Sequence, residues 1–179
     1  AAALQPVQQD GIRIKDQKGP REVRIALASG DIGAVLRSAE LVLIPSPAVA
    51  QDDIARAMAP HLVDGQVVYL PPGTFGSFTM DGIVRAAGNQ AEVTYAETGT
   101  LPWLARKHGA AEVAITIRAI HLPTGVYPQS RSAHALAVIS KALPGVIDDR
   151  AVIHFGGGSS ESSPPSNSRS ALTSNTSAT

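Results

Sequence analysis

The chain lacks cysteine altogether: none of its 179 residues is one. This absence excludes disulfide bonds, thiolate metal sites and a cysteine nucleophile, although it does not indicate a cellular compartment. Any chemistry that the protein carries out must therefore use other side chains.

The sequence also lacks an excess of charge of either sign. Its 15 basic and 15 acidic residues cancel and are interspersed along the chain, so they form no electrostatic footprint for a nucleic acid or an anionic membrane. No apolar run approaches the roughly 20 residues that cross a bilayer, and the alanine-rich start has neither the basic residues nor the apolar core of a signal peptide. We therefore expect a cytoplasmic protein with no nucleic-acid and no membrane partner.

Patterns typical of metal binding or hydrolysis are missing as well. The histidines show no close paired spacing of the kind that forms a metal site on a helix or hairpin, and no serine has the small-residue frame of a hydrolase nucleophile. His121 follows an alternating segment and has two interpretations: an exposed strand end, which is favoured, or a proton-transfer group that reaches a cleft. We predict no metal ligand and no catalytic residue. The five histidines are His61, His108, His121, His134 and His154.

The chain does contain enough apolar material for one globular core. Hydrophobic residues make up 44% of it, which is typical of a globular domain. After Asp148 the composition changes to Gly, Ser, Pro, Asn and Thr, which cannot bury enough apolar surface to offset the ordering of the chain. We predict one domain over residues 1–147 and a low-complexity tail over 148–179, mostly disordered from Gly156. Because no helix is predicted after Gly156-Gly157-Gly158, this run is interpreted as a linker and not as a phosphate cradle.

Strands and helices are predicted to alternate along the domain. The period-two pattern of residues 21–28 indicates a strand at an edge or in an antiparallel pair, whereas four consecutive apolar residues at 41–44 and again at 67–70 favour strands covered on both faces. Further strands are expected at 92–97 and, half-exposed, at 113–117. Helices are expected at 31–38, 52–62, 80–87 and 132–143, the second beginning at Asp52 and Asp53. This order predicts an α/β fold with a mostly parallel sheet and flanking helices.

Three loops follow the predicted parallel strands and are candidates for a binding site. Ligands bind beyond the carboxyl ends of the strands in an open parallel sheet, because loops and helix N-termini converge there. The small and rigid residues of these loops would let a flat cofactor approach the backbone. For any single loop the favoured alternative is that proline and glycine merely end a strand. The loops are Pro45-Ser46-Pro47-Ala48, Pro71-Pro72-Gly73-Thr74 and Glu97-Thr98-Gly99-Thr100.

Glu97 is the one carboxylate in these loops. At the end of an apolar strand it could hold a nicotinamide amide or a substrate ammonium group by charge-assisted hydrogen bonds. An ordinary solvated glutamate is the alternative interpretation.

The segments 38–48, 64–73 and 96–98, taken together, resemble the opine dehydrogenases, which are related to the ketopantoate reductases. The resemblance runs from about residue 1 to residue 146 and includes Asp31-Ile32-Gly33 and the loop from Trp103 to Arg106. It implies a Rossmann-like domain that holds NAD or NADP. It also implies a helical domain that brings an imine, formed from an amino acid and a 2-oxo acid, to the cofactor for hydride transfer.

The resemblance also implies which residues line the cofactor and which parts of the family's pattern are missing. The glycine-rich turn and the strand with the ribose-binding acid should precede Ala1, and the catalytic helical domain is absent. We therefore expect an incomplete Rossmann-like sheet, a fragment whose activity is uncertain and whose exposed sheet edge favours self-association. The alternatives are a ketopantoate-reductase-like enzyme and a noncatalytic α/β binding module. The implied cofactor-binding residues are Pro45, Ser46, Pro47, Ala48, Pro71, Gly73, Thr74, Glu97 and Thr98.

Overall fold

A computed structural model of the chain describes residues 4–149. Its main feature is a five-stranded sheet of order β3-β4-β5-β8-β9, in which β3, β4 and β5 run parallel, β8 is antiparallel to β5 and β9 is parallel to β8. The predicted α/β fold with a mostly parallel sheet is thereby confirmed. The strands are β3 (Leu41–Leu43), β4 (Val67–Leu70), β5 (Thr94–Thr98), β8 (Leu122–Tyr127) and β9 (Val146–Asp148).

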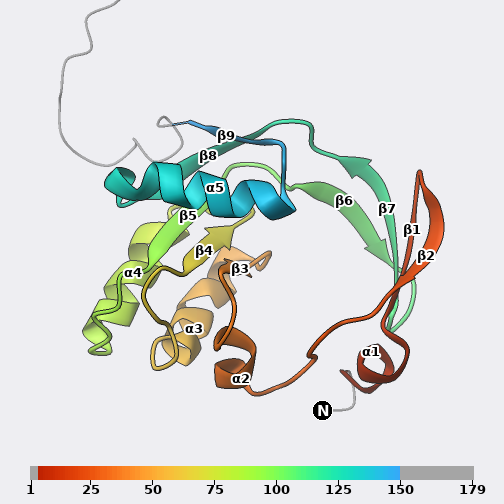
Figure 1. Cartoon of the computed structure of the whole chain (residues 1–179), viewed down its shortest axis with the longest axis horizontal. Coiled ribbons are helices and arrows are strands. Elements are labelled where there is room, and N and C mark those ends of the chain that lie inside the picture. Colours follow the sequence, from red (N-terminus) through yellow and green to blue (C-terminus); the bar gives the residue numbers. More distant parts are fainter. Residues whose placement is uncertain (1–3, 150–179) are drawn as a thin grey trace, which may run out of the picture.

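Helices cover both faces of this sheet (Figure 1). Because side chains alternate along a strand, Val68 and Leu70 of β4 pack with the helices of one face, while Val67 and Tyr69 pack with the helix of the other. Two apolar layers result, and all four β4 side chains are buried. The first face carries α2 (Ile32–Leu36), α3 (Ala48–Met58) and α4 (Gly76–Ala86), and the second carries α5 (Ser132–Ala142), which follows the short 3-10 helix η2 (Gln129–Arg131).

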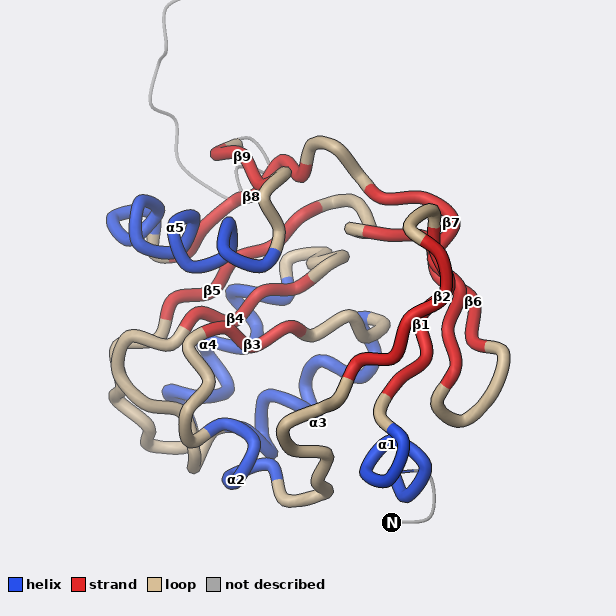
Figure 2. Tube along the Cα trace, turned by 45° about the vertical axis from the view of Figure 1, so that its right-hand side comes forward, coloured by secondary structure: helices blue, strands red, loops and turns tan. Residues whose placement is uncertain are grey.

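A second, four-stranded sheet of order β2-β1-β7-β6 stands beside the first (Figure 2). At the end of β1, the buried carboxylate of Asp16 accepts hydrogen bonds from Arg21 at 2.7 and 2.8 Å and from Arg118 at 2.8 Å. The two guanidinium groups hold the pKa of Asp16 well below its ordinary range. The elements are α1 (Gln5–Asp10), β1 (Ile12–Asp16), β2 (Gly19–Val23), β6 (Trp103–Lys107) and β7 (Glu112–Arg118).

Several predicted elements are wrong in part, and among them the segment from Trp103 to Arg106, expected as a loop, belongs to strand β6. The strand expected at 21–28 is an edge strand in an antiparallel pair, as predicted, but it ends at Val23, because β1 begins at Ile12 and offers no partner beyond that pair. Helix α3 begins at Ala48 and not at Asp52, since Pro47 already has a fixed φ suited to a helix start.

The strand at 41–44 was expected to be covered on both faces and is not. Within residues 4–149, β3 pairs only with β4 and lies at the edge of the sheet, so Leu43 remains 37% exposed. The exposed sheet edge expected from the sequence is therefore present. The predicted linker, His154 and the predicted tail from residue 150 onward lie outside the described residues, while Asp148, where the tail was expected to begin, is the last residue of β9. No helix within the described part is both long and apolar enough to span a membrane.

Candidate functional site

The three predicted loops meet at the carboxyl edge of β3, β4 and β5. Because these strands are parallel neighbours, with Leu43 beside Tyr69 and Leu70 beside Glu97, their ends lie at the same edge of the sheet. Strand β3 leads through residues 44–47 into α3, and β4 leads through residues 71–75 into α4. The backbone N–H of Gly73 donates to the carbonyl oxygen of Thr98 at 3.0 Å, which ties the second loop directly to the third.

Gly73 is held from two sides by buried polar side chains. Its carbonyl oxygen accepts a hydrogen bond from Nε2 of Gln51 at 3.2 Å, and a Cβ atom at this position would overlap the side chain of Glu97. A Cβ atom on Gly76 would likewise overlap Gln51. The loop thus packs as closely as glycine allows, so larger residues at these two positions would push it away from the sheet.

Gln51 is a site residue that the sequence analysis missed. It lies on α3 and is only 3% exposed, in line with the buried Ala55 and Met58. Gln51 precedes Ala55 by four residues and Met58 by seven, so it falls on the apolar face of the helix. This spacing was the signal that could have revealed it. A buried amide needs hydrogen-bond partners, and Gly73 in the 71–75 loop supplies one.

Glu97 is buried, with 1% of its surface exposed, and the interpretation as a solvated glutamate is wrong. Its Oε2 accepts a hydrogen bond from the backbone N–H of Ser77 at 3.3 Å, in the first turn of α4. Burial raises the pKa of this carboxyl, while the N–H of Ser77 opposes the rise. The carboxyl therefore joins the end of β5 to the start of α4 and positions the loop between β4 and α4.

The loop before α4 has an unusual backbone. Thr74 and Phe75 both have positive φ values, 57° and 63°, in the left-handed region that residues with a side chain rarely adopt. Such conformations cost about 1–3 kcal/mol each and persist where the surroundings enforce them, often at functional sites. Here the bonds of Gly73 to Gln51 and Thr98 supply that enforcement.

The predicted site residues fall into two groups by exposure. The first group is inaccessible and holds the loops in place. The second group forms the accessible surface of the edge. Ser46 is half-buried and so falls between the two groups in exposure. The inaccessible residues are Pro71, Gly73, Glu97 and Thr98, and the accessible ones are Pro45, Pro47, Ala48 and Thr74.

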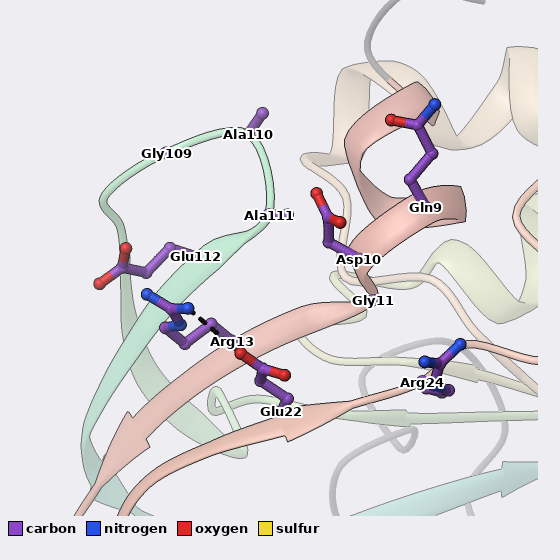
Figure 3. Close-up of a pocket in the computed structure, with 10 residues that line it drawn as sticks. All are labelled: Gln9, Asp10, Gly11, Arg13, Glu22, Arg24, Gly109, Ala110, Ala111 and Glu112. Atoms are coloured by element: carbon purple, nitrogen blue, oxygen red, sulfur yellow. Dashed lines mark hydrogen bonds and ion pairs between the residues drawn. The ribbon is translucent and has the colours of Figure 1, made fainter.

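A cavity of about 450 Å³ lies elsewhere, on the four-stranded sheet (Figure 3). Figure 3 shows Arg13 of β1 paired with Glu22 of β2, beside the turn at Gly109. Both paired side chains are more than half exposed, so the pair contributes little energy, and the cavity contains none of the predicted site residues.

The described histidines give no metal site. Within residues 4–149, no group of three or more His, Asp or Glu side chains could hold a metal ion. His121 is exposed between β7 and β8, which fits the favoured interpretation of an exposed strand end.

Comparison with known proteins identifies a distant relative. No protein-family model matches the chain. Opine dehydrogenase of Arthrobacter sp. (strain 1C) is 29% identical over 129 residues, which are 72% of this chain and 36% of that enzyme. The chain is therefore a distant homologue of opine dehydrogenase and spans about a third of its length, as the sequence resemblance implies.

Solved dehydrogenase structures share the fold. Octopine dehydrogenase with NADH and L-arginine superposes with a TM-score of 0.66 at 19% identity, over 83% of this chain and 39% of that chain. A ketopantoate reductase of Ralstonia eutropha JMP134 gives a TM-score of 0.58 at 20% identity, over 82% of this chain and 45% of that chain. Both comparisons show that the fold, the arrangement of helices and strands, is shared.

Proposed function

We propose that this chain forms part of the NAD(P) cleft of an oxidoreductase of the opine dehydrogenase type. The observation that carries the proposal is the meeting of the loops after β3 and β4 with the end of β5 at one edge of the sheet, where the hydrogen bond from Gly73 to Thr98 joins two of them. In open α/β sheets this edge is where cofactors bind. The homology to opine dehydrogenase supports the same assignment.

The accessible residues of this edge suit a flat, anionic cofactor. Pro45, Pro47 and Ala48 are exposed, and their small or rigid side chains would let an aromatic ring lie against the backbone. The N-terminus of α3 follows directly, with no acidic residue in its first turn, so its dipole favours a nearby phosphate.

The inaccessible residues would position the cofactor without touching it. Gln51 fixes the 71–75 loop through Gly73, Glu97 fixes the start of α4 through Ser77, and the loop presents Thr74 at the edge. When bound, NAD or NADP would supply the hydride. We infer an imine of an amino acid and a 2-oxo acid as its acceptor, because that is the chemistry of the opine dehydrogenase family. No residue of this chain is assigned to proton transfer.

A ketopantoate-reductase-like enzyme is a second candidate. The fold likeness to ketopantoate reductases is nearly as high as that to octopine dehydrogenase, and the described edge carries no side chain that would select an imine over a ketone. Either substrate class is compatible with the same cofactor surface.

The test is a thermal melt of the chain with increasing NADH and, separately, NADPH. A ligand that binds only the folded state stabilises it by about 2.7 kcal/mol at a concentration 100 times its Kd, so the melting temperature should rise. Ser46→Trp adds a large ring at the accessible edge and should abolish the rise. Ala57→Trp adds the same ring on the exposed side of α3 and should preserve it. A cooperative melt that neither nucleotide moves would instead support the noncatalytic binding module.

A further inference from the structure

A second cleft lies at the opposite, amino-terminal edge of the five-stranded sheet. Gly65 precedes β4 and Thr94 begins β5, while Arg131 and His134 lie at the start of α5. These segments meet because β8 runs antiparallel to β5 and places Tyr127 beside Tyr95. The cavity measures about 240 Å³, several times the ~30 Å³ that one water molecule occupies.

The cleft contains a buried hydroxyl that has no partner. The side chain of Thr94 lines it and is 1% exposed, yet its Oγ1 makes no hydrogen bond within residues 4–149. In the same sheet, the hydroxyls of Tyr69 and Thr124 bond to each other at 3.1 Å. Within residues 4–149 the hydroxyls of Ser77 and Tyr95 are also without a partner, but Thr94 is the residue of the three that lines this cleft. Because buried polar groups are nearly always paired, the Thr94 hydroxyl is available to bond to a polar group in the cleft.

The wall of the cleft supplies positive charge. Nη2 of Arg131 contacts Oε2 of Glu92 at 2.9 Å, with 28% of the arginine and 71% of the glutamate side chain exposed. This pair uses one nitrogen of a guanidinium group that has five N–H donors. The N–H at Nε2 of His134 donates to the carbonyl oxygen of Gly65 at 3.1 Å, which holds the imidazole against the loop before β4.

The start of α5 adds to the positive potential. No side chain caps this helix of 11 residues, and its first turn has no acidic residue, although the N–H of Ser132 already donates to the carbonyl oxygen of Gln129 in η2. The dipole of such an end favours an anion. Glu92 is the one acid among the lining residues, and it lies mostly in solvent.

From this arrangement we propose that the cleft binds a small oxyanion, a phosphate or carboxylate group, between Arg131, the hydroxyl of Thr94 and the N-terminus of α5. The anion would accept hydrogen bonds from the guanidinium and the hydroxyl, and Glu92 would compete with it for Arg131. The site does not depend on the proposed cofactor edge, because the two lie at opposite ends of the same strands.

Calorimetric titration of the full chain with inorganic phosphate, at constant ionic strength, tests the proposal. Saturable binding is expected, and loss of a hydrogen bond to the anion in Arg131→Gln or Thr94→Val should weaken it by about tenfold. Glu92→Gln removes the competing carboxylate and should strengthen binding by about threefold. Arg106→Gln removes the same charge from exposed β6 and should leave binding unchanged. Acetate in place of phosphate determines whether carboxylates share the site.

The proposal is overturned if phosphate gives no saturable heat, or if Arg131→Gln binds as the unchanged chain does. Thr94→Val preserves the shape of a buried side chain, and a circular dichroism melt checks that the variant folds. If Thr94→Val does not fold, the opposite effects of Arg131→Gln and Glu92→Gln on phosphate binding decide the question. Retention of the NADH-dependent melting shift in Arg131→Gln separates this site from the proposed cofactor edge.

Discussion

Buried polar residues account for the geometry of the cofactor edge at the scale of single residues. Glu97 is 1% and Gln51 3% exposed; Gln51 bonds to Gly73 in the loop between β4 and α4, and Glu97 bonds to Ser77 in the first turn of α4. Burying a polar group costs free energy unless hydrogen bonds replace its hydration. Each of these residues is therefore tied to the backbone of the segment that it supports, and the segment is tied to the sheet in return.

The ionisation of Glu97 should make stability depend on pH. Burial raises its pKa in the folded state, so the folded protein binds this proton more tightly than the unfolded chain does. The associated stability is fully present below the ordinary glutamate pKa of about 4.3 and is lost as the pH rises through the raised value.

We predict that the Glu97→Gln variant does not lose this stability as the pH rises. Relative to the unchanged chain, the variant should gain about 1.4 kcal/mol by neutral pH for each pH unit by which the pKa is raised. Urea unfolding at a series of pH values from about 4 to 8 measures the free energy of unfolding of both proteins. The contributions of the other carboxyl groups are the same in both and cancel in the difference. Parallel stability curves for the two proteins would contradict the assignment.

At the scale of elements, β3 is the exposed edge of the five-stranded sheet. Within the described part of the chain it pairs only with β4, and Leu43 on it is 37% exposed. An apolar strand with an unpaired edge is a template for pairing with another chain. No charged side chain interrupts Leu41–Leu43, so the edge lacks the usual protection.

We predict that Leu43→Lys reduces self-association at this edge. A lysine on an edge strand opposes strand pairing, because its charge would have to be buried in the new interface. Sedimentation velocity over a range of protein concentrations should show a smaller associated fraction for the variant. Val49→Lys introduces the same charge at a side chain of α3 that is 91% exposed and should change nothing. Equal association of both variants would place the interface elsewhere.

At the scale of the whole molecule, the two sheets differ in how they are stabilised. Every buried apolar side chain of the described residues lies in the five-stranded sheet, its helices or their connections. The four-stranded sheet relies on its backbone ladders and on the Asp16 cluster, and most of its side chains are exposed or half-buried.

We therefore predict that the four-stranded sheet opens more readily. Amides of β1 and β7 should exchange with solvent at least about tenfold faster than those of β4 and β5, since few buried contacts oppose their local opening. Hydrogen exchange followed by mass spectrometry measures this, with β8 as a reference strand in the five-stranded sheet. Exchange of both sheets in a single cooperative step would contradict the prediction.

The sequence by itself determined the elements whose signals are local. Four consecutive apolar residues predicted β4, which is confirmed as fully buried. A helix was predicted to begin at residue 31, and the carboxylate of Asp31 accepts a hydrogen bond from the N–H of Ala34 at the start of α2. The loops at Pro45, Pro71 and Glu97 were also placed correctly at one edge, because parallel strands necessarily end together. Such features depend on neighbours a few residues away, which a pattern in the chain records directly.

Only the tertiary structure decided the features that depend on distant partners. The four-stranded sheet requires β1 to pair with β7, and Asp16 to meet Arg118, 102 residues further along the chain. Glu97 is buried because Gly73 and the start of α4 pack against it, and the cleft at Thr94 exists only because β8 returns Arg131 to the start of β5. Alternation and propensity describe which face of an element is apolar, but the partner that covers this face is chosen by packing across the whole fold.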